Sequence, residues 1–282
     1  MRMKRVKAIC GQRIRLPFIG ILIYSLIGIL LFGCSTTKHL PEGEVLYTGN
    51  KDIFKDPSKT SVGETAIGEV KAALDKSPST KLFGVLPIPF GMWVYNDFVK
   101  YEKGFGKWVF NRFAAKPVFI STVNPELRVK VATNLLHDYG YFNGKVSQQT
   151  IVNPKDSLKA RVEYTVEMRN PYFIDTVYYD RFTPQTLRIM ERGRRWSLLT
   201  PGEQFNVSDL DEERNRLSTL LRNVGYFYFR PDYMTYQADT TLVPGGHISL
   251  RLIPVPGLPA AAQRPYYVGD ASVYLFGKNG EA

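Results

Sequence analysis

The chain has 282 residues, of which 44% are hydrophobic and 22% charged, so it can bury a core and is not wholly disordered. Its two cysteines exclude a disulfide-rich scaffold and a zinc ribbon. The three histidines show no metal-ligand spacing, so we expect neither a metal nor a cofactor. The net charge of +11 keeps a nucleic-acid partner open until the position of the basic residues is considered.

Residues 1–33 have the pattern of a lipoprotein signal peptide. Basic residues come first, and an uncharged, mostly aliphatic run follows over 16–33. This run ends in Leu31, Phe32 and Gly33 before Cys34, which resembles a lipobox. We predict cleavage before Cys34 and lipidation of this cysteine, which anchors a chain without spanning the membrane. The alternative is a single transmembrane anchor, since the apolar run is just long enough to cross a bilayer.

Removal of this leader weakens the charge argument. The leader holds six basic residues and no acid, so the remaining chain has a net charge of +5. A nucleic-acid partner is therefore not expected for an exported protein. The linker at 34–43 lacks the run of acids that resembles a surface-export signal. We expect a protein that is lipid-anchored to the outer membrane and faces the periplasm.

The first predicted module covers residues 44–170. It opens with a strand over 45–54 and a helix over 61–75. A second helix follows Asn124, whose side chain is suited to capping it. Apolar and polar residues alternate over 159–169, which predicts a strand with one buried face.

An insertion rich in aromatic residues separates the two helices of this module, over about 76–122. Such a segment is not an ordinary solvated connection. It either folds back and fills a groove, or it is a docking surface for a partner protein or for lipid headgroups, with Lys103, Lys107 and Arg112 facing phosphate. The candidate surface residues are Phe83, Phe90, Trp93, Tyr95 and Trp108.

An internal repeat marks the end of each second helix. The sequence LLHDYGYF at 135–142 recurs as LLRNVGYF at 220–227, after a helix predicted to begin with Ser208 as its cap. A glycine at this place commonly ends a helix in the left-handed conformation. The aromatic stretches that follow, 141–152 and 226–236, are predicted as strands. The residues expected to determine the fold are Gly140, Tyr141, Phe142, Gly225, Tyr226 and Phe227.

The second predicted module covers residues 171–264. It holds an opening strand, a helix near 183–192, the helix from Ser208 and two further strands, in the order β-α-α-β-β. A proline-led aromatic segment opens this module, and a similar one begins at Pro265. Residues 265–282 are therefore predicted to be the first strand of a third, truncated module.

The lipobox, the repeated Gly-Tyr-Phe and the order β-α-α-β-β together resemble the POTRA arrays of the TamA/BamA-like outer-membrane insertases. The stretches 34–38, 41–45, 116–118 and 135–146 are most similar to TamL-like lipoproteins of Bacteroidetes. The resemblance implies an α+β fold of tandem POTRA modules, each a small three-stranded sheet with two helices on one face. We expect no β-barrel in this chain, because the alternating segments that a barrel needs are too few.

The resemblance implies a periplasmic function in outer-membrane protein assembly or translocation. Such modules would bind unfolded outer-membrane clients, or other envelope assembly proteins, by adding a client strand to a sheet edge. The alternative is a lipid-anchored scaffold that binds one specific partner through the aromatic insertion. We do not expect an enzyme, since the sequence contains no Gly-x-Ser-x-Gly, no phosphate-binding glycine loop and no HExxH motif.

Overall fold

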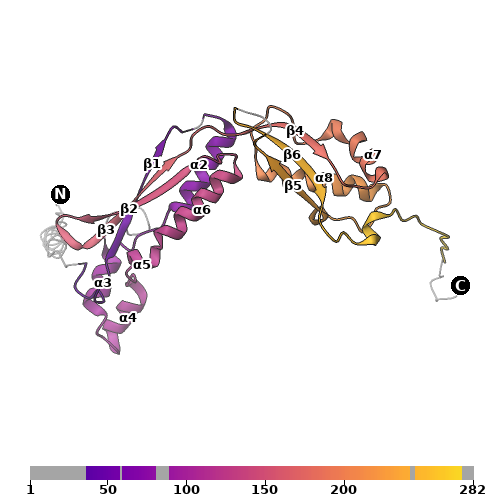
Figure 1. The fold of residues 1–282 in the computed structure, drawn as a ribbon. Helices are drawn as coiled ribbons and strands as arrows, with labels where there is room; N and C mark the ends of the chain where they lie inside the picture. Colours follow the sequence, from indigo (N-terminus) through magenta and orange to yellow (C-terminus); the bar gives the residue numbers. More distant parts are fainter. Residues whose placement is uncertain (1–35, 58, 81–88, 242–244, 275–282) are drawn as a thin grey trace, which may run out of the picture. The chain divides into compact units, whose positions relative to one another are not determined.

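The fold is shown in Figure 1 as a computed structural model that describes residues 36–57, 59–80, 89–241 and 245–274. The predicted signal peptide lies outside these residues. The same holds for four predicted site residues within or next to it and for one in the aromatic insertion: Leu31, Phe32, Gly33, Cys34 and Phe83.

The chain divides into two compact units. The first comprises the residues up to 49 together with 77–123 and 152–160, and the second comprises 50–76, 124–151 and everything from 161 onward. The strands and helices are, in chain order, β1 Leu46–Lys55, α2 Ser61–Leu74, α3 Phe90–Phe98, α4 Gly104–Phe113, α5 Ile120–Val123, α6 Pro125–Asp138, β2 Lys145–Asn153, β3 Asp156–Glu167, β4 Phe173–Tyr179, α7 Pro184–Arg192, α8 Val207–Asn223, β5 Met234–Asp239 and β6 His247–Pro254.

The strands form two three-stranded sheets with the orders β1-β3-β2 and β4-β6-β5. Elements β4, α7, α8, β5 and β6 follow the predicted order β-α-α-β-β. Elements β1, α2, α6, β2 and β3 follow it as well, with α3, α4 and α5 inserted between the two helices. Both sheets also place the last strand of the set between the other two. The predicted α+β fold class with small three-stranded sheets is thereby confirmed.

The central strand of the second sheet is β6. It pairs in parallel with β4, where Val177 faces Leu250, and antiparallel with β5. Leu250 and Leu252 are fully buried in one apolar cluster with Met190 of α7 and Leu217 of α8. The two helices therefore cover one face of this sheet, since an amphipathic helix buries its apolar side against the apolar face of a sheet.

Helices α2 and α6 pack against each other within the second unit. The Asn124 side chain accepts a hydrogen bond from the Leu127 backbone N–H, which confirms the predicted cap of α6. One turn later, Arg128 donates to the Ala73 carbonyl at 2.6 Å and to the Asp75 carbonyl at 3.0 Å. These carbonyls lie at the carboxyl end of α2, where a cation is favourable because of the helix dipole.

Two predictions about the second helix and the aromatic stretches were wrong. The cap of α8 is Asn206, whose side chain accepts the Ser208 N–H at 3.0 Å, so the predicted cap residue already lies inside the helix. Asparagine and serine cap equally well, and the sequence has them two positions apart.

The aromatic residues after each glycine form turns and not the beginnings of strands. The Gly144 N–H donates to the Tyr141 carbonyl, and the Phe229 N–H donates to the Tyr226 carbonyl. These turns delay the strands, so that β2 begins only at Lys145 and β5 at Met234. Residues 265–274 form no strand either. The Tyr266 N–H donates to the Gly225 carbonyl instead of pairing with a strand.

Candidate functional site

One edge of each sheet is partly covered by the chain itself. Beside β1, the Tyr47 N–H donates to the Val118 carbonyl at 2.8 Å and the Ile120 N–H donates to the Val45 carbonyl at 3.0 Å. Beside β4, the Ile174 N–H donates to the Glu203 carbonyl at 2.8 Å. These contacts occupy backbone groups that a client strand would otherwise use.

The opposite edges are β2 and β5, each the outer strand of its sheet. Strand β2 has nine residues, mostly exposed and without proline, and Gln148 and Gln149 lie in its exposed middle. Strand β5 has six residues. An edge strand carries one row of N–H and C=O groups that can pair with an added extended peptide. The two edges are therefore the surfaces best suited to β-augmentation.

The first Gly-Tyr-Phe sequence lies against the segment that connects α7 to α8. Gly140 has φ +82°, and Tyr141 is fully buried. Phe142 is half-buried, and its ring lies 5.2 Å from the ring of Tyr172 and 5.1 Å from that of Phe205, centroid to centroid. The Tyr172 N–H donates to the Gly140 carbonyl at 2.9 Å.

The second Gly-Tyr-Phe sequence has the same backbone but an open surface. Gly225 has φ +101°, and Tyr226 is buried. Phe227 is 63% exposed and borders an open groove of about 560 Å³. The groove is lined by Arg222, Asn223, Val224, Gly225, Phe227, Tyr266, Tyr267 and Val268.

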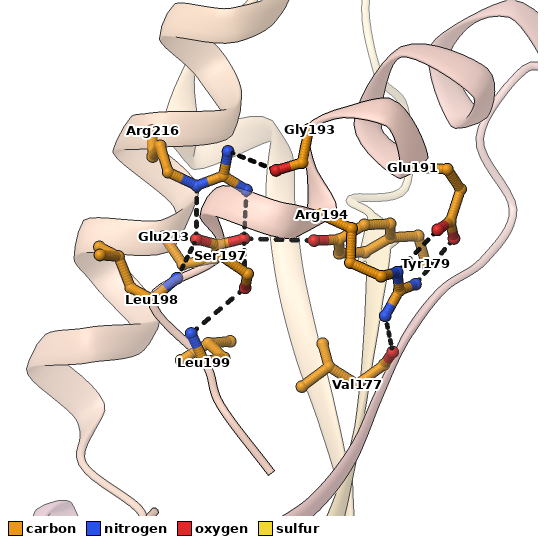
Figure 2. A network of polar contacts seen from close by, with 10 residues as sticks. All are labelled: Val177, Tyr179, Glu191, Gly193, Arg194, Ser197, Leu198, Leu199, Glu213 and Arg216. Atoms are coloured by element: carbon orange, nitrogen blue, oxygen red, sulfur yellow. Dashed lines mark hydrogen bonds and ion pairs between the residues drawn. The ribbon is translucent and has the colours of Figure 1, made fainter.

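A buried carboxylate holds the connection between α7 and α8 in place (Figure 2). Glu213 of α8 is fully buried and forms an ion pair with Arg216 at 2.6 Å. Its oxygens also accept hydrogen bonds from the Ser197 hydroxyl (3.0 Å), the Leu198 N–H (3.0 Å) and the Tyr179 hydroxyl (3.2 Å). Glu213 thereby ties the first part of the connecting segment to α8.

Arginine side chains extend this network toward α7 and β4. Arg216 donates to the Gly193 carbonyl at 3.2 Å, at the end of α7. Arg194 donates to the Val177 carbonyl of β4 at 2.7 Å and pairs with Glu191 of α7. The connecting segment is thus fixed at its start to three elements of the module.

The ionisation of this network follows from its contacts. Burial raises the pKa of Glu213, but the hydrogen bonds from Arg216, Leu198 and Ser197 and the charge of Arg216 together outweigh burial, so this pKa is lowered. Burial and the nearby Glu213 charge raise the pKa of the Tyr179 hydroxyl to about 12. Because donors of the same chain surround the carboxylate, the network positions the connecting segment.

The aromatic insertion divides into buried and exposed side chains. Trp93 and Tyr95 on α3 are half-buried, and the Tyr95 ring lies 5.7 Å from that of Phe110 on α4. Phe90 is exposed, and Trp108 is 57% exposed. We call the exposed set the α3–α4 aromatic surface, and its residues are Phe90, Tyr101, Phe105, Trp108 and Phe113.

Basic side chains accompany this surface. Lys103 and Arg112 are exposed, and the Lys107 ammonium lies 5.3 Å from the centre of the Phe110 ring. Four residues predicted from the sequence belong to these helices, and of these Phe90 and Trp108 are exposed whereas Trp93 and Tyr95 are half-buried. Exposed rings with flanking cations can contact either an apolar protein surface or lipid headgroups.

Over the residues that the structure describes, no group of three or more histidine, cysteine, aspartate or glutamate side chains could hold a metal ion. The same described residues contain no helix with the length and hydropathy required to cross a bilayer.

Sequence analysis did not identify the residues that cover the first Gly-Tyr-Phe sequence. Gln204 and Phe205, which pack against the first Gly-Tyr-Phe, have no motif of their own. The buried ion pair of Glu213 with Arg216 was not predicted either. The spacing of Glu213 and Arg216, three residues apart on one helix face, was a signal for that pair.

Comparisons with known proteins give weak structural likeness only. No protein-family model matches the chain. No curated protein matches it either. Among solved structures, POTRA3-5 of BamA from Haemophilus influenzae shares 14% identity, with 77% of this chain and 69% of that chain covered and a TM-score of 0.39.

Two further structures show a similar likeness. POTRA1-3 of Omp85 from Anabaena shares 15% identity, covering 75% of this chain and 62% of that one, with a TM-score of 0.31. BamA from Haemophilus ducreyi lacking POTRA domains 1-3 shares 15% identity, covering 57% and 26%, with a TM-score of 0.32. The chain thus spans less than two thirds of these two structures. At such scores the assignment of the fold rests on the strand order and helices of the chain itself.

Proposed function

We propose that the chain is the periplasmic POTRA region of an outer-membrane protein assembly or translocation factor of the TamL-like type. Its modules, at about 44–170 and 171–264, bind extended segments of unfolded outer-membrane proteins, or strands of assembly partners, by β-augmentation. It acts by binding and not by catalysis.

The observation that carries this proposal is the asymmetry of the sheet edges. The outer sides of β1 and β4 accept or donate hydrogen bonds within their own chain, whereas β2 and β5 lie at the other edges. Main-chain pairing at such an edge reads little sequence, which suits a module that meets many different clients. Strand β2 is the better candidate because it is longer and largely exposed.

Two adjacent proline substitutions test this edge. Successive residues of a strand direct their N–H groups to opposite sides, so only one of Gln148 and Gln149 has its N–H on the outer edge. Proline is tolerated where the N–H faces solvent and breaks the ladder where it does not. We expect one of Gln148→Pro and Gln149→Pro to keep native stability and to lose client binding.

The probe is a fluorescent peptide with the alternating sequence of an outer-membrane strand, and its binding to the lipid-free chain is followed by anisotropy. The second proline variant serves as the internal control, since it should unfold the first sheet. If the stable variant binds the peptide as tightly as the unmodified chain, β2 is not the docking edge.

Anchoring and location are part of the same proposal. The lipobox residues Leu31, Phe32 and Gly33 direct cleavage, and acyl chains on Cys34 hold the protein on the outer membrane, since two or more chains anchor stably. Cys34→Ala should leave the chain unprocessed and absent from the outer-membrane fraction. Normal processing of this variant would refute the anchor.

A second candidate function is a scaffold that binds one envelope partner, and the exposure of the α3–α4 aromatic surface favours it. The pair of substitutions Phe105→Ser and Trp108→Ser removes two stacked exposed rings, whose centroids lie 5.7 Å apart. A scaffold would lose its partner and keep the binding of the strand peptide. Loss of peptide binding would instead show that this surface is part of the client-binding site.

A further inference from the structure

The exposed rings of the α3–α4 aromatic surface form one continuous patch. The Phe105 ring stacks on the Trp108 ring, and their centroids lie 5.7 Å apart. The Trp108 ring in turn lies 6.0 Å from that of Phe113, which lies 6.3 Å from that of Phe90. Phe105 is 75% exposed, the largest value in this set. Contiguous apolar patches on a protein surface mark binding sites, so this one needs an occupant.

The backbone holds this patch in a fixed position. The Ala115 N–H donates to the Gly91 carbonyl at 2.9 Å, which joins the chain after α4 to the start of α3. A Cβ on Gly91 would lie only 2.5 Å from the Ala115 side chain, so the two segments are in close contact. On α4, Phe110 faces Tyr95 of α3, whereas Trp108 is exposed. The rings are therefore presented by a packed helix pair.

The charge around the patch has one sign. From Lys103 to Lys116 the sequence has four basic residues and no acid. Two of the four, Lys107 and Arg112, lie on α4 itself. Long basic side chains can pack their stems on apolar groups and extend their charges outward. An anionic surface therefore complements this patch.

The kind of basic residue favours a lipid surface over a protein. Protein–protein interfaces are enriched in arginine and depleted of lysine. Here three of the four basic residues are lysines, namely Lys103, Lys107 and Lys116. Helices that lie on a bilayer combine lysine and arginine with tryptophan and phenylalanine, as α4 does.

The proposed lipid anchor would keep this patch near a bilayer. Cys34 lies roughly a dozen residues before Leu46, the first residue of β1, and a chain of that length spans at most about 40 Å. The Tyr47 N–H of β1 donates to the Val118 carbonyl at 2.8 Å, just after the insertion helices. Residues up to 49 and residues 77–123 also belong to one compact unit. This step rests on the proposed function, whereas exposure and charge do not.

We propose that the α3–α4 aromatic surface docks on the phospholipid bilayer that carries the lipid anchor. The rings of Phe105 and Trp108 enter the headgroup region, and Lys103, Lys107 and Arg112 contact lipid phosphates. The anchor limits the distance of the first unit from the membrane, and this second contact determines which of its sides faces the lipid. Two contacts on one chain also bind more tightly than either alone.

Vesicles of phosphatidylcholine, with or without phosphatidylglycerol, test this surface on the chain from residue 35 onward, which carries no acyl group. We expect it to sediment with the anionic vesicles. The double variant Phe105→Ser with Trp108→Ser should bind at least about tenfold more weakly, because binding scales with the apolar area buried in the bilayer. The matched control is Tyr178→Ser with Trp196→Ser, which removes two exposed rings of the second unit and should bind as the unmodified chain does.

A second pair of variants tests the charges. Lys103→Gln with Arg112→Gln should remove most of the preference for phosphatidylglycerol, because basic residues near the surface are attracted to anionic lipids. Its control is Arg188→Gln with Arg192→Gln, which removes two exposed arginines of the second unit and should keep the preference.

Tryptophan fluorescence shows which part of the chain meets the lipid. The chain has three tryptophans, and Trp93→Phe with Trp196→Phe leaves Trp108 as the only one. Its emission should shift to shorter wavelength on addition of the anionic vesicles and should be quenched by lipids brominated near the headgroup. Unchanged emission of vesicle-bound chain would refute docking through this surface.

The proposal also fails if the unmodified chain binds neither kind of vesicle, or if the Phe105→Ser, Trp108→Ser variant binds as well as the unmodified chain. Loss of a protein partner in this variant, without vesicle binding of the unmodified chain, would assign the surface to the scaffold instead. Strand-peptide binding and the processing of Cys34→Ala are measured without vesicles. Their outcome therefore separates a failure of the proposed function from a failure of this docking.

Discussion

The two Gly-Tyr-Phe surfaces share a sequence pattern and a backbone turn but differ in burial. At Gly140 the following phenylalanine packs on Tyr172 and Phe205, whereas at Gly225 the corresponding Phe227 is largely exposed. The glycine and the buried tyrosine are local features of the helix end. The residues that cover the first surface, Gln204 and Phe205, lie more than 60 residues further along the chain, and we call them the cover. The motif therefore sets the turn, and a distant segment determines whether the surface is closed.

The largest effect is expected from the carboxylate that holds this cover. Glu213→Ala leaves the Arg216 guanidinium, which is largely buried, without its anionic partner and releases residues 197–198 from α8. Removing one partner of a buried ion pair costs about 3 kcal/mol or more in the free energy of unfolding. Urea unfolding measures the loss. The double variant Glu213→Ala with Arg216→Ala is the control, and it should be less destabilised than the sum of the single variants.

The Glu213→Ala variant should also make the first surface resemble the second. Its Phe205 N–H should lose protection from hydrogen exchange, because the connecting segment is no longer held at its start. Unchanged protection of this amide would show that the packing of Phe205 alone holds the cover.

Valine substitutions at the two glycines should separate the energetic cost of the left-handed turn from that of the contact with the covering residues. Both variants place a β-branched residue at positive φ, which costs about 1–2 kcal/mol. Gly140→Val also forces its side chain against Phe205 and Tyr172, and overpacking adds about 1–3 kcal/mol. Gly225→Val meets the Tyr266 backbone and the Pro265 side chain, in a segment that forms no strand and can shift, so we expect the smaller loss.

The control for this pair is Gly257→Val. Gly257 has φ +77° and no atom within 4 Å of an added Cβ, so it reports backbone strain alone. The difference in the free energy of unfolding between Gly140→Val and this control, measured with urea, gives the cost of the contact with Phe205 and Tyr172. If Gly140→Val and Gly225→Val lose equal stability, the two surfaces are closed alike.

Alanine in place of each phenylalanine should show the same contrast on a smaller scale. Phe142→Ala removes a half-buried ring from its contacts with Tyr172 and Phe205, and we expect a loss of about 2 kcal/mol, below the range for a fully buried phenylalanine. Phe227→Ala acts on an exposed side chain and should stay within about 0.5 kcal/mol. Thermal or urea unfolding compares the two. A large loss for Phe227→Ala would mean that its surface is already covered.

The sequence predicted the fold well where the pattern was local. Both capped helices, the order of strands and helices along the chain and the repeat follow from periodicity, caps and glycine positions. The cap of α8 was displaced by two residues because Asn206 and Ser208 are both good caps. The aromatic stretches were taken for strands because their composition is that of strands, while the turn after a left-handed glycine prevents pairing there.

The closed surface and the ion pair could not be predicted in the same way. Gln204 and Phe205 belong to a connection without periodicity, and only the folded chain brings them to Gly140. The exposure of individual aromatic residues in the insertion could not be predicted from the sequence either. Trp93 and Trp108 look alike in the sequence, and the packing of α3 on α4 separates them.

The smallest expected effect is the pH dependence of the packing of Phe205 against the first surface. The pKa of Glu213 is lowered below its ordinary value of 4.5, so the folded state binds this proton less readily than the unfolded chain. Its contribution to stability is therefore present above about pH 4.5 and is lost as the pH falls through the lowered pKa. The neighbouring Asp209 has a raised pKa, chiefly because of burial, and acts with the opposite sign. The pH profile of stability for the Glu213→Gln variant, subtracted from that of the unmodified chain, gives the contribution of the glutamate.

We expect the Phe205 amide to lose protection from hydrogen exchange in this acid range before the β6 amides do. The protection of the Phe227 amide at the open surface should not change in this range. Loss of protection at Phe205 and β6 at the same pH would mean that the cover opens only when the whole module unfolds.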